Sequence, residues 1–274
     1  MIKRIKSHKV LSFLLFLIPL LLIWIIWGNT HIETKWYKLI DDEVPSDFDN
    51  YTIAQVSDLH NKDWGNKLIR ELEAAYPDII VVTGDLIDSR NTDIPVAVEF
   101  IERAAQIAPV YFVTGNHEAR SSQYEELIEA INQTVILLDN RTFTLSSGVS
   151  ELTLLGIEDP SFPGADPENE LESLTEDVEG FKILLSHRPE LFDLYVKQDI
   201  DLVFSGHAHG GQFRLPFIGG LIAPDQGLFP KYTEGIYTEE DTNMVVSRGL
   251  GNSLFPFRIN NKPELIFLRF STRY

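Results

Sequence analysis

Residues 202–212 read Leu202-Val-Phe-Ser-Gly-His-Ala-His-Gly-Gly-Gln212, an apolar run that passes into two histidines flanked by glycines. A short apolar run bounded by turn residues is typical of a buried strand. The chain holds seven histidines, and His207 and His209 follow this strand at once. Alone, the stretch fits either a solvated turn or a pair of metal ligands, and the rest of the chain decides between them.

The same pattern occurs at four other places. An apolar, strand-like run ends in a polar cluster at S-D-L-H (57–60), G-D-L-I-D (84–88), G-N-H-E (115–118) and S-H-R (186–188). Ligands of open α/β sheets bind beyond the carboxyl ends of the strands, so these clusters are expected on one rim. The metal ligands that this pattern predicts are Asp58, His60, Asp85, Asn116, His187, His207 and His209.

Each cluster alone fits an ordinary turn or helix cap, but five of them at strand ends predict a metal site. Two divalent ions ~3.5–4 Å apart need a bridging carboxylate, and Asp85, on a central strand, is the natural bridge. The chain has no cysteine. Ligation by nitrogen and oxygen alone suits Mn, Fe or Zn, so two such ions are expected as cofactors. Gly84, Gly115 and Gly206 are expected to let the backbone turn sharply beside the ligands.

The order of the segments predicts the fold class. Helices are predicted at 67–75, 96–107, 121–132 (with Ser121 or Ser122 as N-cap) and 189–196. Strands are predicted at 32–39, 51–56, 79–83, 110–114, 135–138, 142–145, 152–157, 181–185, 202–204, 244–247 and 265–270. This succession predicts an α/β fold of two packed mixed β-sheets flanked by helices. The acidic segment around residues 161–170 (SFPGADPENE) is expected to be a long surface loop.

The N-terminal segment predicts a membrane anchor. Residues 10–27 are 18 residues without a charge, preceded by Lys3, Arg4, Lys6 and Lys9. As a helix they span about 27 Å, close to the thickness of a bilayer core. The run is longer than the apolar core of a signal peptide and no small-residue cleavage site follows, which favours an uncleaved anchor. The predicted organisation is a cytoplasmic basic tail (1–9), a transmembrane helix (10–27), a linker with an edge strand (28–49) and an extracytoplasmic domain (50–274).

The charge of the chain excludes one class of partner. The net charge is −18, and since the first 27 residues contribute +4, the remainder carries −22. A body this acidic repels nucleic-acid phosphates. It does not exclude a phosphoester substrate, because bound cations can reverse the local field.

The combined motif, D-x-H, G-D-x-x-D, G-N-H-E, H and G-H-x-H, resembles the calcineurin-like metallophosphoesterases over roughly residues 50–270. The stretches S-H-R-P-E (186–190), G-H-x-H-G-G-Q (206–212), P-D-Q-G (224–227) and S-R-G-L-G (247–251) are similar to a membrane-anchored bacterial branch. That branch is similar to UDP-2,3-diacylglucosamine hydrolase-like phosphodiesterases. Ala208 stands where the branch often has threonine.

The resemblance implies a role for each matching residue. One metal ion would be held by Asp58, His60, Asp85 and His209, and the other by Asp85, Asn116, His187 and His207. His117 would protonate the leaving oxygen, and Asp88 would orient a ligand or hold its loop. The implied reaction is hydrolysis of a phosphodiester or pyrophosphate, with lipid-linked substrates included, by attack of a metal-bridging hydroxide.

Two alternatives stay open at this stage. The chain could be a metal-binding surface or scaffold protein of weak activity, although such relatives are expected to lose ligands and none is missing here. It could also be a phosphomonoesterase for soluble substrates. Substrate-binding residues and the oligomeric state are not predicted.

Overall fold

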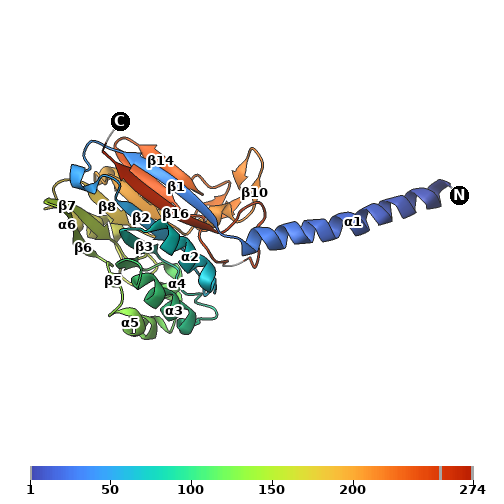
Figure 1. Cartoon of the computed structure of the whole chain (residues 1–274), viewed down its shortest axis with the longest axis horizontal. Coiled ribbons are helices and arrows are strands. Elements are labelled where there is room, and N and C mark those ends of the chain that lie inside the picture. Colours follow the sequence, from blue (N-terminus) through green and yellow to red (C-terminus); the bar gives the residue numbers. More distant parts are fainter. Residues whose placement is uncertain (1, 253–254, 273–274) are drawn as a thin grey trace.

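A computed structural model describes residues 2–252 and 255–272, apart from the side chains of residues 2–12 and 14. Two six-stranded sheets form its centre (Figure 1). The first has the order β1 (Glu33–Ile40), β16 (Glu264–Ser271), β2 (Thr52–Val56), β3 (Ile79–Thr83), β4 (Val110–Val113), β5 (Ile136–Leu137). The second has the order β14 (Gly235–Glu239), β15 (Thr242–Val246), β9 (Leu202–Ser205), β8 (Lys182–Leu185), β7 (Ser150–Gly156), β6 (Arg141–Ser147).

Both sheets are mixed, as predicted. In the first, β2 to β5 are parallel and β16 runs antiparallel to β2. In the second, β15, β9, β8 and β7 are parallel and the edge strands β14 and β6 are antiparallel. The strand predicted in the linker is β1, at the edge of the first sheet.

Helices cover the outer face of each sheet. The helices are α2 (Asn66–Ala75), α3 (Ile94–Ala105), α4 (Asn116–Arg120), α5 (Tyr124–Ile131), α6 (Pro167–Thr175) and α7 (Phe192–Lys197), with 3-10 turns η1 (Ser46–Phe48), η2 (Pro189–Leu191) and η3 (His209–Gly211). The side chains of α2, α3 and α5 pack on the first sheet, and those of α6 and α7 pack on the second.

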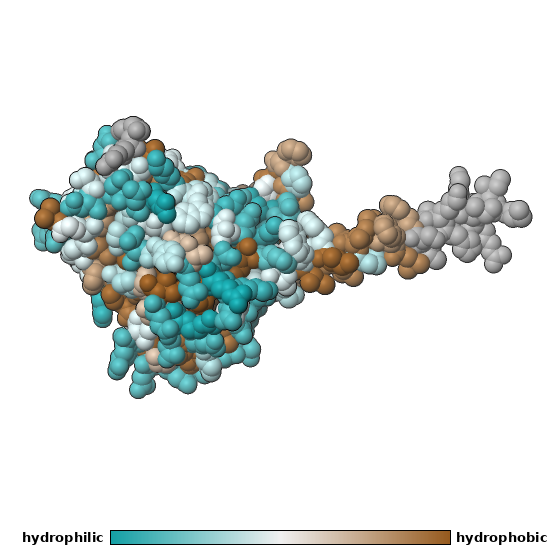
Figure 2. All heavy atoms as spheres, in the orientation of Figure 1, coloured by the Kyte–Doolittle hydropathy of each residue, from teal (hydrophilic) through white to brown (hydrophobic). Residues whose placement is uncertain are grey.

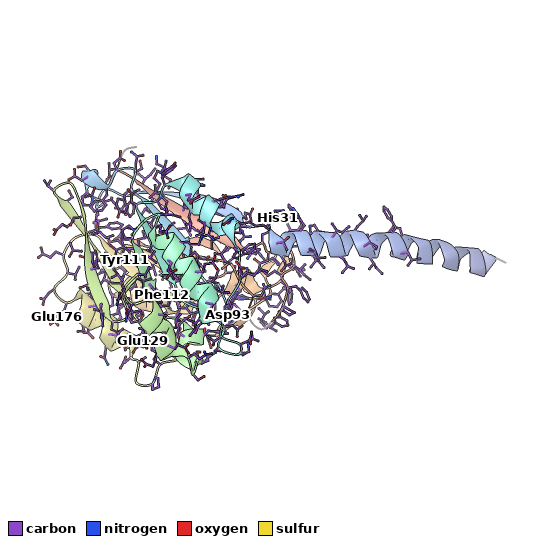
Figure 3. The ribbon with its side chains drawn as sticks, turned by 60° about the horizontal axis from the view of Figure 1, so that its bottom comes forward. His31, Asp93, Tyr111, Phe112, Glu129 and Glu176 are labelled. Carbon is purple, nitrogen blue, oxygen red and sulfur yellow. The ribbon has the colours of Figure 1, made fainter. Side chains whose placement is uncertain are left out.

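The apolar runs of the central strands follow from this layering. Successive side chains of a strand point to opposite faces, and both faces of these sheets are covered. In β4, Phe112 packs among the helices and Tyr111 packs between the sheets (both labelled in Figure 3). Uninterrupted apolar strands with polar residues only at their ends are therefore the expected pattern.

The carboxyl ends of the parallel strands of the two sheets meet on one side of the molecule. Deep between the sheets, Gln55 of β2 donates a hydrogen bond from Nε2 to the carbonyl oxygen of Ser205 in β9, at 2.9 Å. The polar clusters after β2, β3, β4, β8 and β9 therefore face a common space.

Some local predictions were wrong. The segment expected as a surface loop contains α6, because Asp166 caps it by accepting a hydrogen bond from the Asn169 backbone and Pro167 occupies its first turn. The helix expected at 121–132 begins only at Tyr124, after Gln123, so neither Ser121 nor Ser122 is its N-cap. Ser121 instead ends α4, a short helix that the sequence did not separate from its neighbour.

The chain begins with α1 (Ile2–Thr30), a 29-residue helix that projects from the body (Figures 1 and 2). Within the residues whose side chains the structure describes, no helix is long and apolar enough to cross a membrane. The predicted span of residues 10–27 falls partly on side chains outside that description, and it stays a prediction. Near the base of α1, Asn29 and the backbone of Arg258 exchange two hydrogen bonds of 2.9 and 2.7 Å, which dock the helix on the body.

Beyond the end of β5, Asp139 predicts a measurable pH dependence of stability. Its carboxylate accepts hydrogen bonds from the backbone N–H and the hydroxyl of Thr114, each at 2.9 Å, and burial raises the pKa of Asp139 from 3.8 to about 6. A raised carboxyl pKa means that the folded state binds more protons than the unfolded state between these pH values. The free energy of unfolding therefore falls as pH rises through this window, by about 3 kcal/mol.

In an Asp139→Asn variant the amide oxygen accepts the backbone N–H of Thr114 and the amide NH2 donates to its hydroxyl, so both contacts persist while the buried charge is removed. We expect it to match the wild type in denaturant unfolding near pH 4 and to exceed it by about 2–3 kcal/mol at pH 7.5. The same change at exposed Asp241 serves as the control. Parallel pH profiles for Asp139→Asn and the wild type would contradict the assignment.

Candidate metal centre

Four predicted ligands form a first buried cluster at the ends of β2, β3 and β9. The ligand atoms of Asp58, His60, Asp85 and His209 all lie within 4.8 Å of one another. His209 Nε2 lies 3.2 Å from His60 Nε2 and 3.4 Å from Asp58 Oδ1. His60 Nε2 lies 3.5 Å from Asp85 Oδ2. Ligand atoms that bind one ion at ~2.1 Å stand roughly 3.0–3.5 Å apart, so the cluster has the dimensions of a single metal site.

A second cluster lies beside it, at the ends of β3, β4, β8 and β9. His187 Nε2 lies 3.2 Å from Asp85 Oδ2 and 3.1 Å from His207 Nδ1. Asp85 Oδ2 is thus within 3.5 Å of one imidazole from each cluster. A carboxylate oxygen in that place is the bridge that a pair of ions requires.

Asn116 also lies at the second cluster. One polar atom of its side-chain amide is 2.8 Å from His207 Nδ1. With its oxygen turned toward the cluster, Asn116 can serve as a neutral ligand. Neutral imidazole, carboxylate and amide oxygen form a donor set that suits a divalent transition metal.

The backbone at the ligands is unusual. The residues Asp58, His60, Asp85, His207 and His209 all have a positive φ, between 47° and 65°. For non-glycine residues this left-handed conformation costs roughly 1–2 kcal/mol each. Strain of this kind persists where the surrounding structure over-determines it, and here it gathers on five of the seven predicted ligands.

The prediction that glycines permit sharp turns holds for one of three. Gly84 has a φ of 85°, but Gly115 and Gly206 do not have positive φ. Glycine is needed at these two positions because a side chain would not fit. A Cβ at Gly206 would lie 2.0 Å from Ser57 Oγ, and one at Gly115 would lie 2.4 Å from Asp85 Oδ1.

Hydrogen bonds around the clusters fix the ligand orientations. Ser57 donates its hydroxyl to Asp58 Oδ2 at 2.6 Å, which leaves Oδ1 for a metal ion. His187 Nδ1 lies 2.7 Å from the Thr83 carbonyl oxygen and donates its proton there, so that Nε2 has the free lone pair once the proton it shares with Asp85 is lost. Partners of this kind set the tautomer and position of metal-binding histidines.

Glu118, to which the sequence assigned no role, holds two of the loops together. Its carboxylate accepts hydrogen bonds from the backbone N–H groups of Asp85, Gly115 and Ile87, at 2.8, 2.7 and 3.1 Å. The glutamate of G-N-H-E is therefore a link between the loops after β3 and β4.

A group of charged residues around His207 was missed by the sequence analysis. Arg188 binds Asp159 through two hydrogen bonds of 2.5 and 2.8 Å and approaches His207 Nε2 at 3.0 Å. Asp225 pairs with Arg188 and lies 2.9 Å from His207 Nε2. When His207 carries its proton on Nε2, Asp225 accepts that proton and Nδ1 is left free toward the second cluster. The sequence feature that could have identified Asp225 was its position in the P-D-Q-G stretch.

Asp225 gives a testable prediction about metal affinity. Removing the carboxylate in Asp225→Ala lets the imidazole of His207 adopt the wrong tautomer, and we expect metal affinity to fall about 10–100-fold. Titration with a competing chelator measures this. Asp241→Ala, which removes an exposed carboxylate of the β14–β15 turn, is the matched control. Equal affinities in the two variants would contradict the role of Asp225.

His117 and Asp88 lie beside the first cluster. His117 Nδ1 accepts a hydrogen bond from the Ser89 backbone at 3.0 Å, so the neutral imidazole carries its proton on Nε2. Burial lowers the pKa of His117. Asp88 Oδ1 lies 3.7 Å from His117 Nδ1, and its carboxylate mainly binds the backbone and guanidinium of Arg90. Asp88 thus holds its loop.

The charges inside the clusters are strongly coupled. Burial alone would raise the pKa of Asp85, but His187 holds it well below its usual range. Burial alone would lower the pKa of His187, but Asp85 raises it to about 10. Burial also lowers the pKa of His209 well below its usual range, and that of His60 to about 3. The neutral imidazoles of His60 and His209 beside the Asp85 carboxylate have lone pairs free to bind a cation. Binding of a cation would displace the proton that Asp85 and His187 share.

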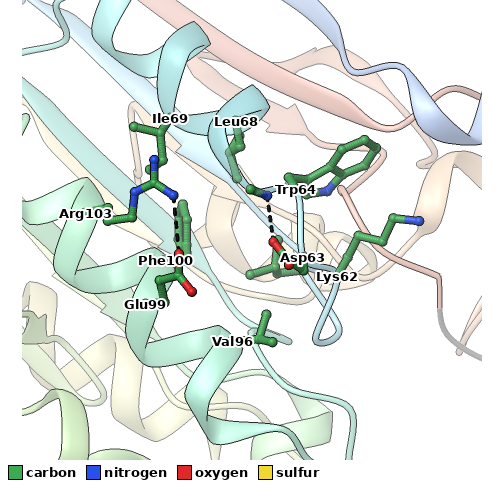
Figure 4. Close-up of a pocket in the computed structure, with 11 residues that line it drawn as sticks. Lys62, Asp63, Trp64, Leu68, Ile69, Val96, Glu99, Phe100 and Arg103 are labelled. Carbon is green, nitrogen blue, oxygen red and sulfur yellow. Dashed lines mark hydrogen bonds and ion pairs between the residues drawn. The ribbon is translucent and has the colours of Figure 1, made fainter.

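The clusters are separate from the pocket between α2 and α3. Trp64, Phe100 and Arg103 line that pocket, and Arg103 pairs with Glu99 at 3.4 Å (Figure 4). None of the predicted metal ligands lines it.

Comparisons with known proteins agree with the motif. Residues 51–211 match the calcineurin-like phosphoesterase family. The chain is 32% identical over 244 residues to an uncharacterized metallophosphoesterase of Bacillus subtilis, YkuE, covering 85% of this chain and 84% of that one.

Two further relatives have descriptive names. Phosphodiesterase YaeI of Escherichia coli K12 is 24% identical over 257 residues, covering 88% of this chain and 92% of its own. A transmembrane protein with metallophosphoesterase domain from Danio rerio is 28% identical over 253 residues, and the match covers 83% of this chain and 56% of the fish protein. The family match spans more than half of the chain and contains every predicted metal ligand. The chain belongs to the calcineurin-like phosphoesterases, a family of binuclear metal-dependent phosphoric ester hydrolases.

Proposed function

We propose that this protein is a membrane-anchored phosphodiesterase that uses two divalent metal ions, Mn, Fe or Zn. The observation that carries the proposal is the place of Asp85 Oδ2, which lies 3.5 Å from His60 Nε2 and 3.2 Å from His187 Nε2. One buried carboxylate between two sets of imidazoles is the arrangement of a shared ligand. Asp58, His60 and His209 would complete one metal site, and Asn116, His187 and His207 would complete the other.

When bound, the two ions would lower the pKa of a water molecule and neutralise charge on the phosphoryl oxygens. The residues of the chain divide the other tasks. Glu118 holds the loops after β3 and β4 in position, and Asp225 orients the imidazole of His207, through the hydrogen bonds described above. To protonate the leaving oxygen, His117 would act in its imidazolium form, with its Nδ1 proton facing Ser89 Oγ at 3.2 Å and Asp88 Oδ1 at 3.7 Å and its Nε2 proton passing to the leaving oxygen.

A diester substrate and a membrane location are the finer parts of the proposal. The name of the Escherichia coli relative supports a phosphodiester, and that of the fish relative supports a membrane location. The large apolar side chains described in α1, from Phe13 to Trp27, are mostly exposed, which suits a lipid environment. Residues 1–9 would remain in the cytoplasm and the domain would face outward, where lipid-linked phosphodiesters or pyrophosphates would be within reach.

The direct test is activity of the full chain, in detergent and in vesicles, after reconstitution with Mn²⁺, Fe²⁺ or Zn²⁺. The panel contains an aryl monoester, an aryl diester, a lipid phosphate and a nucleotide-linked lipid. We expect hydrolysis of diesters or pyrophosphates, with the lipid-linked substrate preferred in vesicles. Exclusive hydrolysis of the soluble monoester would contradict the proposed substrate class, and no hydrolysis by any metal form would contradict the activity.

A further inference from the structure

Two small hairpins after β9 carry an exposed apolar surface. They are β10–β11 (Arg214–Leu215 with Gly219–Gly220) and β12–β13 (Ile222–Ala223 with Gly227–Leu228). Together with residues 255–257 they form what we call the apolar lip, residues 213–229 and 255–257. Its exposed side chains are Leu215, Phe217, Ile218, Leu228, Phe229 and Phe257. Phe217, in the turn of the first hairpin, is fully exposed, and Phe229 is 68% exposed. A contiguous group of large exposed apolar side chains is typical of an interaction surface.

The lip is poor in charge, although the chain has 64 charged side chains among its 274 residues. The only charged residues in the lip are Arg214 and Asp225. Arg214 binds the Gly210 carbonyl oxygen at 2.8 Å and Glu234 at 2.5 Å. Asp225 binds Arg188 and His207. Both charges are thus paired with residues outside the lip, although the Asp225 side chain is 52% exposed, and the turn of the first hairpin around Phe217 carries no charge.

The lip stands beside the base of α1. The ring of Phe213 packs on Phe255 and Phe257, with centroids 5.1 and 5.8 Å apart. The backbone of the next residue, Arg258, exchanges two hydrogen bonds with the side chain of Asn29 in α1. Figure 2 shows hydrophobic residues on the projection that rises beside the base of the helix, where Figure 1 labels β10.

A cavity of about 270 Å³ lies between α1 and the body, and Arg258, the residue after Phe257, forms part of its wall. Its walls also include Trp24, Trp27, Glu33 and Lys262, together with Arg248, which pairs with Glu33 at 2.5 Å. The ammonium of Lys262 lies 3.9 Å from the centre of the Trp27 ring. Indole rings beside a lysine are typical of the membrane interface, where the ammonium of Lys262 can reach an anionic headgroup.

From the exposed apolar side chains, the paired charges and the adjacent helix, we infer that the apolar lip inserts into the lipid bilayer beside α1. The bilayer is therefore a second, monotopic contact of the domain. Because Asp225 of the lip binds His207, this contact holds the metal centre at the membrane surface. The inference builds on the anchor proposed above, and its test reads the two contacts separately.

The absence of native cysteine makes site-specific labelling direct. The full chain, with a single substitution Phe217→Cys, is labelled with an environment-sensitive fluorophore and reconstituted in vesicles of phosphatidylcholine and phosphatidylglycerol. Ile18→Cys reports on α1, and Val149→Cys, in the exposed β6–β7 turn, is the water-exposed control. We expect the labels at 217 and 18 to shift to the blue and be quenched by spin-labelled lipid, whereas iodide quenches the label at 149.

Every other outcome either supports or contradicts the inference. Iodide quenching at 217 together with lipid quenching at 18 overturns the lip contact and leaves the anchor intact. A blue shift at 217 that grows with protein density and resists lipid quenching also overturns it, because a second copy would then cover the lip. Lipid quenching at 217 without lipid quenching at 18 supports the lip and contradicts the anchor. Leu228→Cys in the second hairpin repeats the test if Phe217→Cys does not fold.

Discussion

The variant Asp85→Asn is expected to lose both tightly bound metal ions and more than about 10³-fold in kcat/KM, equivalent to about 4 kcal/mol of transition-state stabilisation. Asp85 Oδ2 lies within 3.5 Å of one imidazole of each cluster, and Oδ1 accepts the backbone N–H of His117 at 2.8 Å. An amide is neutral, and one of its two ends is a donor that cannot bind a cation. Metal content by mass spectrometry of the dialysed protein and steady-state rates on a diester measure the effect.

The matched control for this prediction is Asp93→Asn. Asp93 is exposed before α3, its side chain makes no capping hydrogen bond, and the change removes the same charge (Figure 3 labels it). We expect wild-type metal content and rates. If Asp85→Asn retains two equivalents of metal, Asp85 is not the shared ligand.

The second large effect is expected for His117→Ala, which should keep both metal ions while kcat falls ~10²–10⁴-fold. His117 lies beside the first cluster, but its Nδ1 is bonded to the Ser89 backbone and the proton on Nε2 is the group that matters. The loss should be larger for poor leaving groups such as alkoxides and smaller for nitrophenolate, which needs little protonation. Rates over a series of leaving groups, with metal content measured in parallel, separate these effects.

His31→Ala, at the base of α1 and outside both clusters (labelled in Figure 3), serves as the histidine control. A fall in metal content that parallels the fall in activity would assign His117 to metal binding. A loss that is the same for every leaving group would contradict its role as proton donor.

The strand-helix order and the position of the clusters could be predicted from the sequence. The central strands are buried on both faces, so their apolar runs are uninterrupted and the polar residues after them stand out. Both sheets and the neighbouring places of Asp58, Asp85 and His207 follow from that pattern. The family resemblance assigned His207 and His187 to one metal site and His209 and His60 to the other. The short distances within each pair agree with that assignment.

Other features depend on tertiary contacts that no local pattern carries. The positive φ values of the ligand residues are imposed by the surrounding structure against their intrinsic preference. Asp225 reaches His207 from a loop 18 residues further along the chain, and Arg188 pairs with Asp159 across 29 residues. Helix α6 was missed because its proline and aspartate were interpreted as loop residues, although both also begin helices.

The central claim is that one buried carboxylate joins two metal sites. The most direct measurement is a crystal structure of the Mn²⁺-reconstituted protein with anomalous scattering recorded at the manganese edge. The account predicts two anomalous peaks ~3.5–4 Å apart with Asp85 between them, one beside His60 and His209 and the other beside His187 and His207. A single peak, or two peaks with Asp85 bound to neither, would contradict it.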